Sequence, residues 1–204
     1  MRQTAGPWLI FPLSGEREVA GPDVDANAQS GSAADLTLDA EWMASACLGG
    51  MLPQDVADDL QRAALLYQRG NDAEPVLLDL YQRAWHHPAV HIALYRFYFY
   101  RHRLQDALDV AVRCLLKVAG DIGLPEDWRA VQPEQAKFAG PEYEIVPRFY
   151  LYTLKGCAYL NMRLGRLQTG GEMLAQLRRL DPRDRLGGSV LADVLAHIGE
   201  SDDD

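Results

Sequence analysis

The sequence predicts an all-helical protein whose helices fold back on one another as antiparallel hairpins. Apolar residues recur at helical spacing from Leu38 to Ile198, and no stretch shows the strict alternation of a half-buried strand. Glycine and proline interrupt this pattern after each run, so they divide the chain into separate helices. We expect about seven main helices, stacked in a short array.

The segment 151–182 is the clearest hairpin, with the sequence LYTLKGCAYLNMRLGRLQTGGEMLAQLRRLDP. Gly165 breaks its first apolar run, and Asp181-Pro182 ends its second. Small residues such as Gly156 and Gly170 stand where two close-packed helices must touch. The apolar positions of the two helices are Leu151, Leu154, Cys157, Ala158, Leu160, Leu164, Leu167, Met173, Leu174, Leu177 and Leu180.

Three helices are expected near the start of the folded part. The first covers residues 37–48 and ends at Gly49-Gly50. The second begins at Pro53, because proline suits a first helical turn, and the third covers residues 72–86 with Pro75 in its first turn. Their inward positions are Leu38, Trp42, Ala46, Val56, Leu60, Ala63, Ala64, Tyr67, Val76, Leu77, Leu80, Ala84 and Trp85.

An earlier hairpin over residues 88–119 repeats the later one at an offset of 63 residues. His102 stands at the position of Gly165, and Tyr95 stands where the later copy has the small Ala158. Since a helical-hairpin repeat spans about 34 residues, about 29 residues are inserted between the copies, at roughly 120–148. A loop of this length inside a compact array is often functional.

A last helix over residues 183–198 is expected to close the array, with Leu186, Val190, Leu191, Val194, Leu195 and Ile198 facing inward. The helical domain therefore spans residues 37–199. Residues 1–36 form an irregular segment and flexible linker, in which the apolar cluster Trp8–Leu13 can dock on the body or on another protein. Residues 200–204 form an acidic tail that we expect to be disordered.

The charge distribution indicates the class of partner, and the cysteines indicate the cellular compartment. The net charge is −9, and the body is dipolar: residues 155–185 carry seven basic and three acidic residues, whereas residues 55–79 carry six acidic and two basic ones. This pattern suits a protein partner better than nucleic acid. No apolar run approaches the roughly 18 residues of a membrane-spanning helix, so we expect no membrane contact. Cys47, Cys114 and Cys157 lie within apolar helical runs, so we expect buried free thiols in a cytoplasmic protein. Pro7 and Pro12 interrupt the apolar patch at the start of the chain, so we expect no export signal.

No motif predicts catalysis, so we expect neither an enzyme nor a cofactor or metal site. His87 and His91 have the i, i+4 spacing of helical metal ligands, but Pro88 favours a capping role for His87. The sequence GRLQTGGEM lacks the lysine and the serine or threonine of a phosphate-binding loop. No strand precedes Ser189, so it does not form a nucleophile elbow.

The hairpin over residues 151–182 and the string RLQDALDVAVRCLL resemble tetratricopeptide (TPR) repeats. That resemblance implies a concave groove lined by the first helix of each hairpin. It places eight candidate partner-binding residues there: Arg96, Phe99, Tyr100, Tyr152, Lys155, Tyr159, Met162 and Arg163. Five aromatics in the six residues Tyr95–Tyr100 cover more than one helix face, so some of them must reach the surface.

The string GCAYLNMRLGRLQTGGEMLAQLRRLDPRDRLGGSVLADVL also resembles the small bacterial TPR-like accessory factors associated with nitrogenase. This resemblance implies a non-catalytic adaptor or chaperone whose partner is the nitrogenase molybdenum-iron protein or another nitrogen-fixation component. We expect the aromatic and basic surface to meet an acidic face of that partner. Two alternatives stay open: a secretion-type chaperone that binds an extended peptide, and a metal- or ligand-binding enzyme accessory that uses the histidines.

Overall fold

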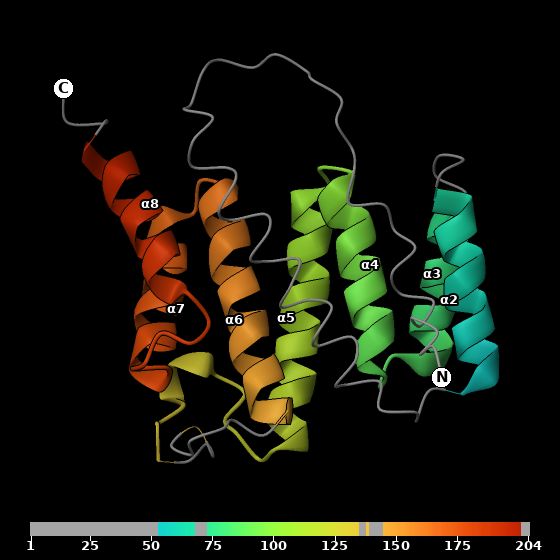
Figure 1. The fold of residues 1–204 in the computed structure, drawn as a ribbon, viewed down its shortest axis with the longest axis horizontal. Helices are drawn as coiled ribbons and strands as arrows, with labels where there is room; N and C mark the ends of the chain where they lie inside the picture. The colour runs from blue at the N-terminus through green and yellow to red at the C-terminus, as the bar shows by residue number, and fades with distance from the viewer. Residues whose placement is uncertain (1–52, 68–72, 135–137, 139–144, 201–204) are drawn as a thin grey trace, which may run out of the picture. The chain divides into compact units, whose positions relative to one another are not determined.

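The computed structural model describes residues 53–67, 73–134, 138 and 145–200. Within these ranges the chain forms seven α-helices, one short 3-10 helix (η2) and no strand, which confirms the all-helical class (Figure 1). The helix expected over residues 37–48, the Trp8–Leu13 cluster and residues 201–204 lie outside the described residues. The elements are α2 (Gln54–Tyr67), α3 (Ala73–Ala84), α4 (Pro88–Tyr100), α5 (Leu104–Asp121), η2 (Trp128–Ala130), α6 (Ile145–Arg163), α7 (Leu167–Leu180) and α8 (Gly188–Glu200).

The chain divides into two compact units, residues 1–93 and 94–204, and α4 crosses the boundary. In the first unit, α2 packs against α3 through residues such as Leu60 and Leu77, which are 3% and 0% exposed. Trp85 was expected to be inward but is 53% exposed. The reason is that α3 ends at Ala84, where a turn bond from His87 N to the Ala84 carbonyl replaces the next helical turn.

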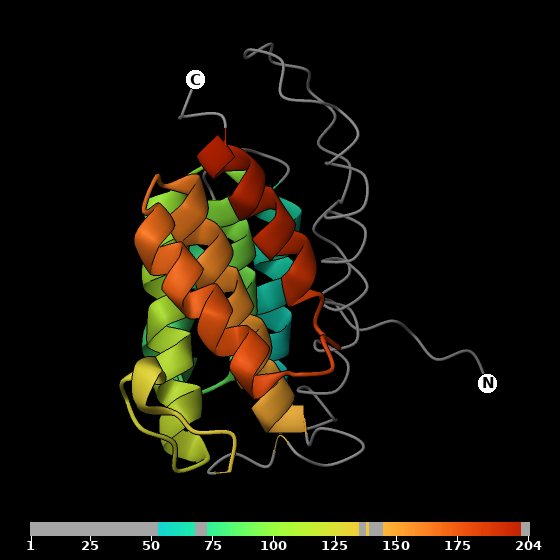
Figure 2. The same cartoon turned by 90° about the vertical axis from the view of Figure 1, so that its left-hand side faces the viewer.

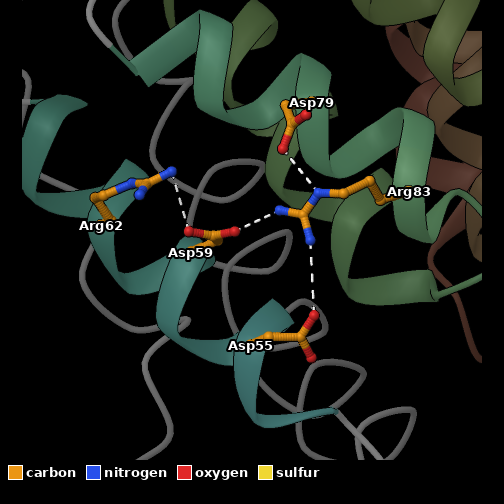
Figure 3. A network of polar contacts seen from close by, with 5 residues as sticks. All are labelled: Asp55, Asp59, Arg62, Asp79 and Arg83. Atoms are coloured by element: carbon orange, nitrogen blue, oxygen red, sulfur yellow. Dashed lines mark hydrogen bonds and ion pairs between the residues drawn. The ribbon is translucent and has the colours of Figure 1, made fainter.

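Ion pairs join α2 to α3 on their exposed side (Figure 3). The guanidinium of Arg83 lies among three carboxylates: Nε is 2.8 Å from Asp79, one terminal nitrogen is 3.6 Å from Asp55, and the other pairs with Asp59. Asp59 also pairs with Arg62 at 3.0 Å. Apart from Asp59, whose side chain is 20% exposed, these side chains are 40–71% exposed, so we expect the network to add little to stability.

In the second unit, α5 packs against α6, α6 against α7, and α7 against α8 (Figures 1 and 2). The hairpin α6–α7 has the close approach expected at its glycines. A Cβ on Gly170 would lie 2.6 Å from Cγ of Met162 and 3.0 Å from the Ala158 carbonyl oxygen, so only glycine fits there without a shift. The core of this unit includes Leu151, Leu154, Cys157, Leu160, Leu174 and Leu177, none of them more than 2% exposed.

The two hairpin turns have the same geometry at the predicted offset of 63 residues. His102 and Gly165 both adopt left-handed backbone angles, with φ of 57° and 75°. Arg103 N donates to the carbonyl of Tyr98 at 3.0 Å, and the equivalent bond joins Arg166 N to the carbonyl of Asn161 at 2.8 Å. The α4–α5 and α6–α7 hairpins therefore share one turn geometry.

The insert begins with a turn after α5, and its η2 segment then packs on the outer face of α7. The side chain of Gln176 donates to the carbonyls of Trp128 and Val131, at 2.9 and 2.7 Å, and Arg179 donates to the Val131 carbonyl at 2.6 Å. Figure 2 shows this segment, in yellow, at one end of the helices. Val131 is fully buried, so this part of the insert belongs to the body.

The closing helix α8 begins at Gly188, five residues later than position 183 where the sequence predicts it. Asp181 and Asp184 accept hydrogen bonds from Leu186 N and Ser189 N at 2.9 and 3.1 Å, so the intervening residues form turns instead of helix. The expected inward face is only partly correct. Leu186 and Leu191 are buried, whereas Val190 and Val194 are 48% and 40% exposed.

Candidate protein-binding surface

The first helices of the two hairpins bring a cluster of aromatic rings together. Phe99 of α4 lies at the centre, with ring centroids 5.9 Å from Tyr95, 5.6 Å from Tyr100 and 6.1 Å from Tyr159 of α6. Tyr100 is 36% exposed, and the other three rings are half-buried. We call these four residues the aromatic cluster. Its partly exposed rings offer the kind of area that dominates binding energy at protein interfaces.

The other aromatics of the run Tyr95–Tyr100 point elsewhere, as the sequence predicts for rings that cover more than one helix face. Phe97 and Tyr98 are buried, at 0% and 6% exposure. The guanidinium of Arg103 stacks 4.5 Å from the ring centre of Tyr98 and so covers it next to the turn. The helix therefore divides its rings between the core and the surface.

Arg163 contacts one edge of the aromatic cluster, at Tyr159. One of its terminal nitrogens donates to the hydroxyl of Tyr159 at 2.8 Å, and its guanidinium lies 5.7 Å from the centre of the same ring. Arg163 itself is exposed. An arginine stacked on a tyrosine at the surface is a residue pair favoured at interfaces, because both groups bury apolar area and keep a polar end for hydrogen bonds.

Tyr95 joins this cluster although the sequence marks it only as a misfit at a small-residue position. A Cβ on Gly156 would lie 3.7 Å from the Tyr95 hydroxyl, an ordinary van der Waals distance, so Tyr95 packs directly against α6 at Gly156. Burial raises the pKa of Tyr95, and the neighbouring Tyr152 adds to the effect. The Tyr95 hydroxyl therefore stays neutral. The pairing of Tyr95 with Ala158, together with a glycine two positions earlier, was the available sequence signal.

Two of the eight candidate residues are not on this surface. Lys155 and Met162 are only 6% and 7% exposed. The ammonium group of Lys155 donates to the carbonyl of Leu186, and Met162 packs where Gly170 brings α7 close. At 100° per residue, both side chains lie about 60–80° around the axis of α6 from Tyr152. They face the neighbouring helices, so the expectation that they line an open groove is wrong.

The remaining six candidates lie on α4 and α6. The structure brings Phe99, Tyr100, Tyr159 and Arg163 together through the contacts above. Tyr152 and Arg96 are half-buried. At 100° per residue, Tyr152, Gly156, Tyr159 and Arg163 share one stripe of α6. Whether these residues bind a partner stays a prediction.

Two of the histidines and the two described cysteines have packing or capping roles. His91 is 1% exposed, its Nε2–H donates to the Trp85 carbonyl, and its ring lies edge-on to Tyr81 at 5.1 Å. His87 Nδ1 accepts from Ala89 N at 3.3 Å and so caps α4. Cys114 and Cys157 are buried free thiols, and burial raises the pKa of Cys157.

The described residues contain no group of three His, Cys, Asp or Glu side chains arranged to hold a metal ion. Over the same residues, no helix has both the length and the apolar character needed to cross a membrane.

Fold and surface together define a class: an all-helical protein of consecutive hairpins whose first helices present an aromatic cluster. The chain is 39% identical over 134 residues to an uncharacterized 19.8 kDa protein of Azotobacter chroococcum mcd 1, described as lying in the nifW 5′ region. The aligned residues make up 66% of this chain and 75% of the relative. The chain therefore belongs to the same family as this nif-region protein.

No family model and no solved structure matches the chain, so its resemblance to tetratricopeptide repeats stays a prediction. The hairpin array itself does not depend on that resemblance, because it follows from the turn geometry and helix packing of the described residues.

Proposed function

We propose that this protein is a non-catalytic, cytoplasmic accessory factor of nitrogen fixation that binds a folded protein partner. The observation that carries the proposal is the aromatic cluster with Arg163 stacked beside it, on the first helices of two consecutive hairpins. The nif-region location of a family member supports the process. The candidate partner is a nitrogenase component, with the molybdenum-iron protein as the first to test.

The surface has the chemistry of an interface centre. Four rings lie in continuous contact through Phe99, so a partner that covers them excludes water from apolar area already arranged for contact. Arg163 supplies a cation at the edge, and the Tyr159 hydroxyl accepts its hydrogen bond. A complementary carboxylate on the partner would pair with this arginine.

The test is a pull-down with the tagged full-length chain from nitrogen-fixing cells of its own organism, followed by affinity measurement with purified molybdenum-iron protein. Replacing Tyr159 and Arg163 together by alanine should weaken binding by about 2–4 kcal/mol, or roughly 30- to 1,000-fold. Arg178→Ala is the matched control, because it removes an exposed arginine of α7 away from the cluster. It should bind as the wild type does.

Wild-type affinity in a folded Tyr159→Ala, Arg163→Ala variant would show that the contact surface lies elsewhere. A chain that prefers isolated unfolded segments to any folded protein would favour the peptide-chaperone alternative. Melting temperatures of both variants serve as the folding control, and we expect small changes since Arg163 is exposed and Tyr159 half-buried.

A further inference from the structure

The outer stripe of α7 is a docking surface whose occupant belongs to this same chain. Its residues Glu172, Gln176 and Arg179 follow one another at i, i+4 and i+7, so they share one face of the helix. All three hold the η2 segment: Glu172 pairs with Arg129 at 2.9 Å, and the other two donate to the Val131 carbonyl. Gln176 is only 8% exposed beneath this segment.

The offset of 63 residues maps these three positions onto Asp109, Arg113 and Leu116 of α5. Val112, which is equivalent to Ala175, lies on the same face of the helix. We call these four residues the α5 stripe. All four are exposed, and the two aliphatic side chains are 36% and 43% exposed. Asp109 accepts a hydrogen bond from Gln105 of the same helix at 2.8 Å. Within the described part of the chain, no segment is seen to bond to the α5 stripe as η2 does to α7.

The two hairpins differ in the length of chain that precedes them. Residues 122–144 precede α6, and this link supplies η2 to the second helix of its own hairpin. Residues 85–87 precede α4, and three residues are too few to reach across a hairpin to α5. The link that leads into the first hairpin therefore supplies no segment to α5, and among residues 53–67, 73–134, 138 and 145–200 none bonds to the α5 stripe as η2 does to α7.

We propose that the α5 stripe binds an extended segment of a partner protein, held as η2 is held on α7. The chemistry of η2 indicates what that segment carries. A basic residue faces Asp109, as Arg129 faces Glu172. An aliphatic residue two positions later is expected to cover Val112 and Leu116, because the residue two positions after Arg129 is the fully buried Val131. Arg113 donates to a backbone carbonyl of the segment, as Gln176 does.

This second contact surface is separate from the aromatic cluster, because it lies on the second helix of the hairpin and the cluster lies on the first. The exposed aliphatic pair at i, i+4 supplies the apolar part of the contact, and the charged pair fixes the direction of the segment. The occupant must be extended, since on α7 the bonds go to two backbone carbonyls, those of Trp128 and Val131.

The experiment places the photo-crosslinking residue p-benzoylphenylalanine at Leu116 of the full-length chain, expressed in its own organism. The matched control carries the same residue at Ala175, which is exposed on α7 and equivalent to Val112. We expect a cross-link from position 116 to a different protein. Mass spectrometry should place it in a segment with a basic residue two positions before an aliphatic one. Adding Arg113→Glu should lower the cross-link yield at least about fivefold, the effect of an interface residue.

Four results would overturn the proposal: a cross-link to residues 1–52 of the same chain, a cross-link to a second copy, a partner segment without the basic and aliphatic pair, or no cross-link above the control. An unchanged yield with Arg113→Glu would also overturn it. Normal partner binding through the aromatic cluster, together with any of these results, would leave the proposed function standing. Circular dichroism checks that each labelled chain folds.

Discussion

Replacing Gly165 by valine should destabilise the protein through the backbone alone. Gly165 has φ of 75°, a left-handed angle that side chains other than glycine rarely adopt. A Cβ there would meet nothing within 4 Å, so no steric clash with a neighbour contributes. The left-handed conformation costs an L-residue about 1–2 kcal/mol, and a β-branched residue brings the total to roughly 1–3 kcal/mol. In a chain of this size, each kcal/mol lowers Tm by about 2–4 °C.

His102 provides the matched variant, because it occupies the same turn position with φ of 57°. His102→Gly removes the cost of the left-handed angle, but it also gives the unfolded chain more freedom, which costs about 0.4–1 kcal/mol. The two effects partly cancel and leave a net change of about 1 kcal/mol. We therefore expect a Tm within about 2–4 °C of the wild type for His102→Gly, since 1 kcal/mol changes Tm by that amount.

The assay is thermal unfolding of the full-length chain followed by circular dichroism at 222 nm. The ordering of the two variants is the decisive observation: Gly165→Val must melt below both wild type and His102→Gly. An unchanged Tm for Gly165→Val would refute the backbone reasoning. A fall of similar size for His102→Gly would show that the histidine side chain, and not the left-handed angle, determines the stability of that turn.

Three further variants or measurements test other parts of the second unit. Gly170→Val should cost roughly 1–3 kcal/mol by overpacking against Met162, and urea unfolding with an unchanged midpoint would contradict the close approach of α6 and α7. Burial alone would raise the pKa of Asp184, but hydrogen bonds from Ser189 and Gly188 lower it below its ordinary 3.8. Its contribution to stability is therefore present above about pH 3.8 and lost as pH falls through the lower folded-state pKa. Asp184→Asn should flatten the Tm profile below pH 4, and parallel profiles would exclude this role. The thiol of Cys157 should react slowly with a disulfide reagent in the folded chain and quickly in urea, because burial raises its pKa; fast labelling of the folded chain would contradict its burial.

The sequence could predict the parts of the fold that depend on local chemistry. Few residue types adopt a left-handed backbone angle, so Gly165 predicted the turn of one hairpin and the aligned His102 predicted the turn of the other. Gly170 predicted a close helix contact for the same reason, since only a missing Cβ allows it. These signals need no knowledge of distant residues.

The parts that sequence reasoning missed depend on partners far away in the chain. The start of α8 is set by Asp181 and Asp184, whose side chains bond backbone N–H groups and hold the preceding residues in turns. The position of the insert on α7 depends on Gln176, which donates a hydrogen bond to the carbonyl of Val131, 45 residues earlier in the sequence. Helical periodicity alone does not report such contacts.

Lys155 shows how one such contact changes the interpretation of the candidate surface. As an exposed lysine it would have made the surface basic and the binding sensitive to salt. Its ammonium group is instead buried and bonded to the Leu186 carbonyl, 31 residues away. The exposed cation beside the aromatic cluster is then Arg163, and that arginine is already stacked on Tyr159. Aromatic area therefore outweighs charge on this surface. If this surface binds the proposed partner, we expect recognition to depend more on the shape and apolar character of the partner's face than on strong acidity.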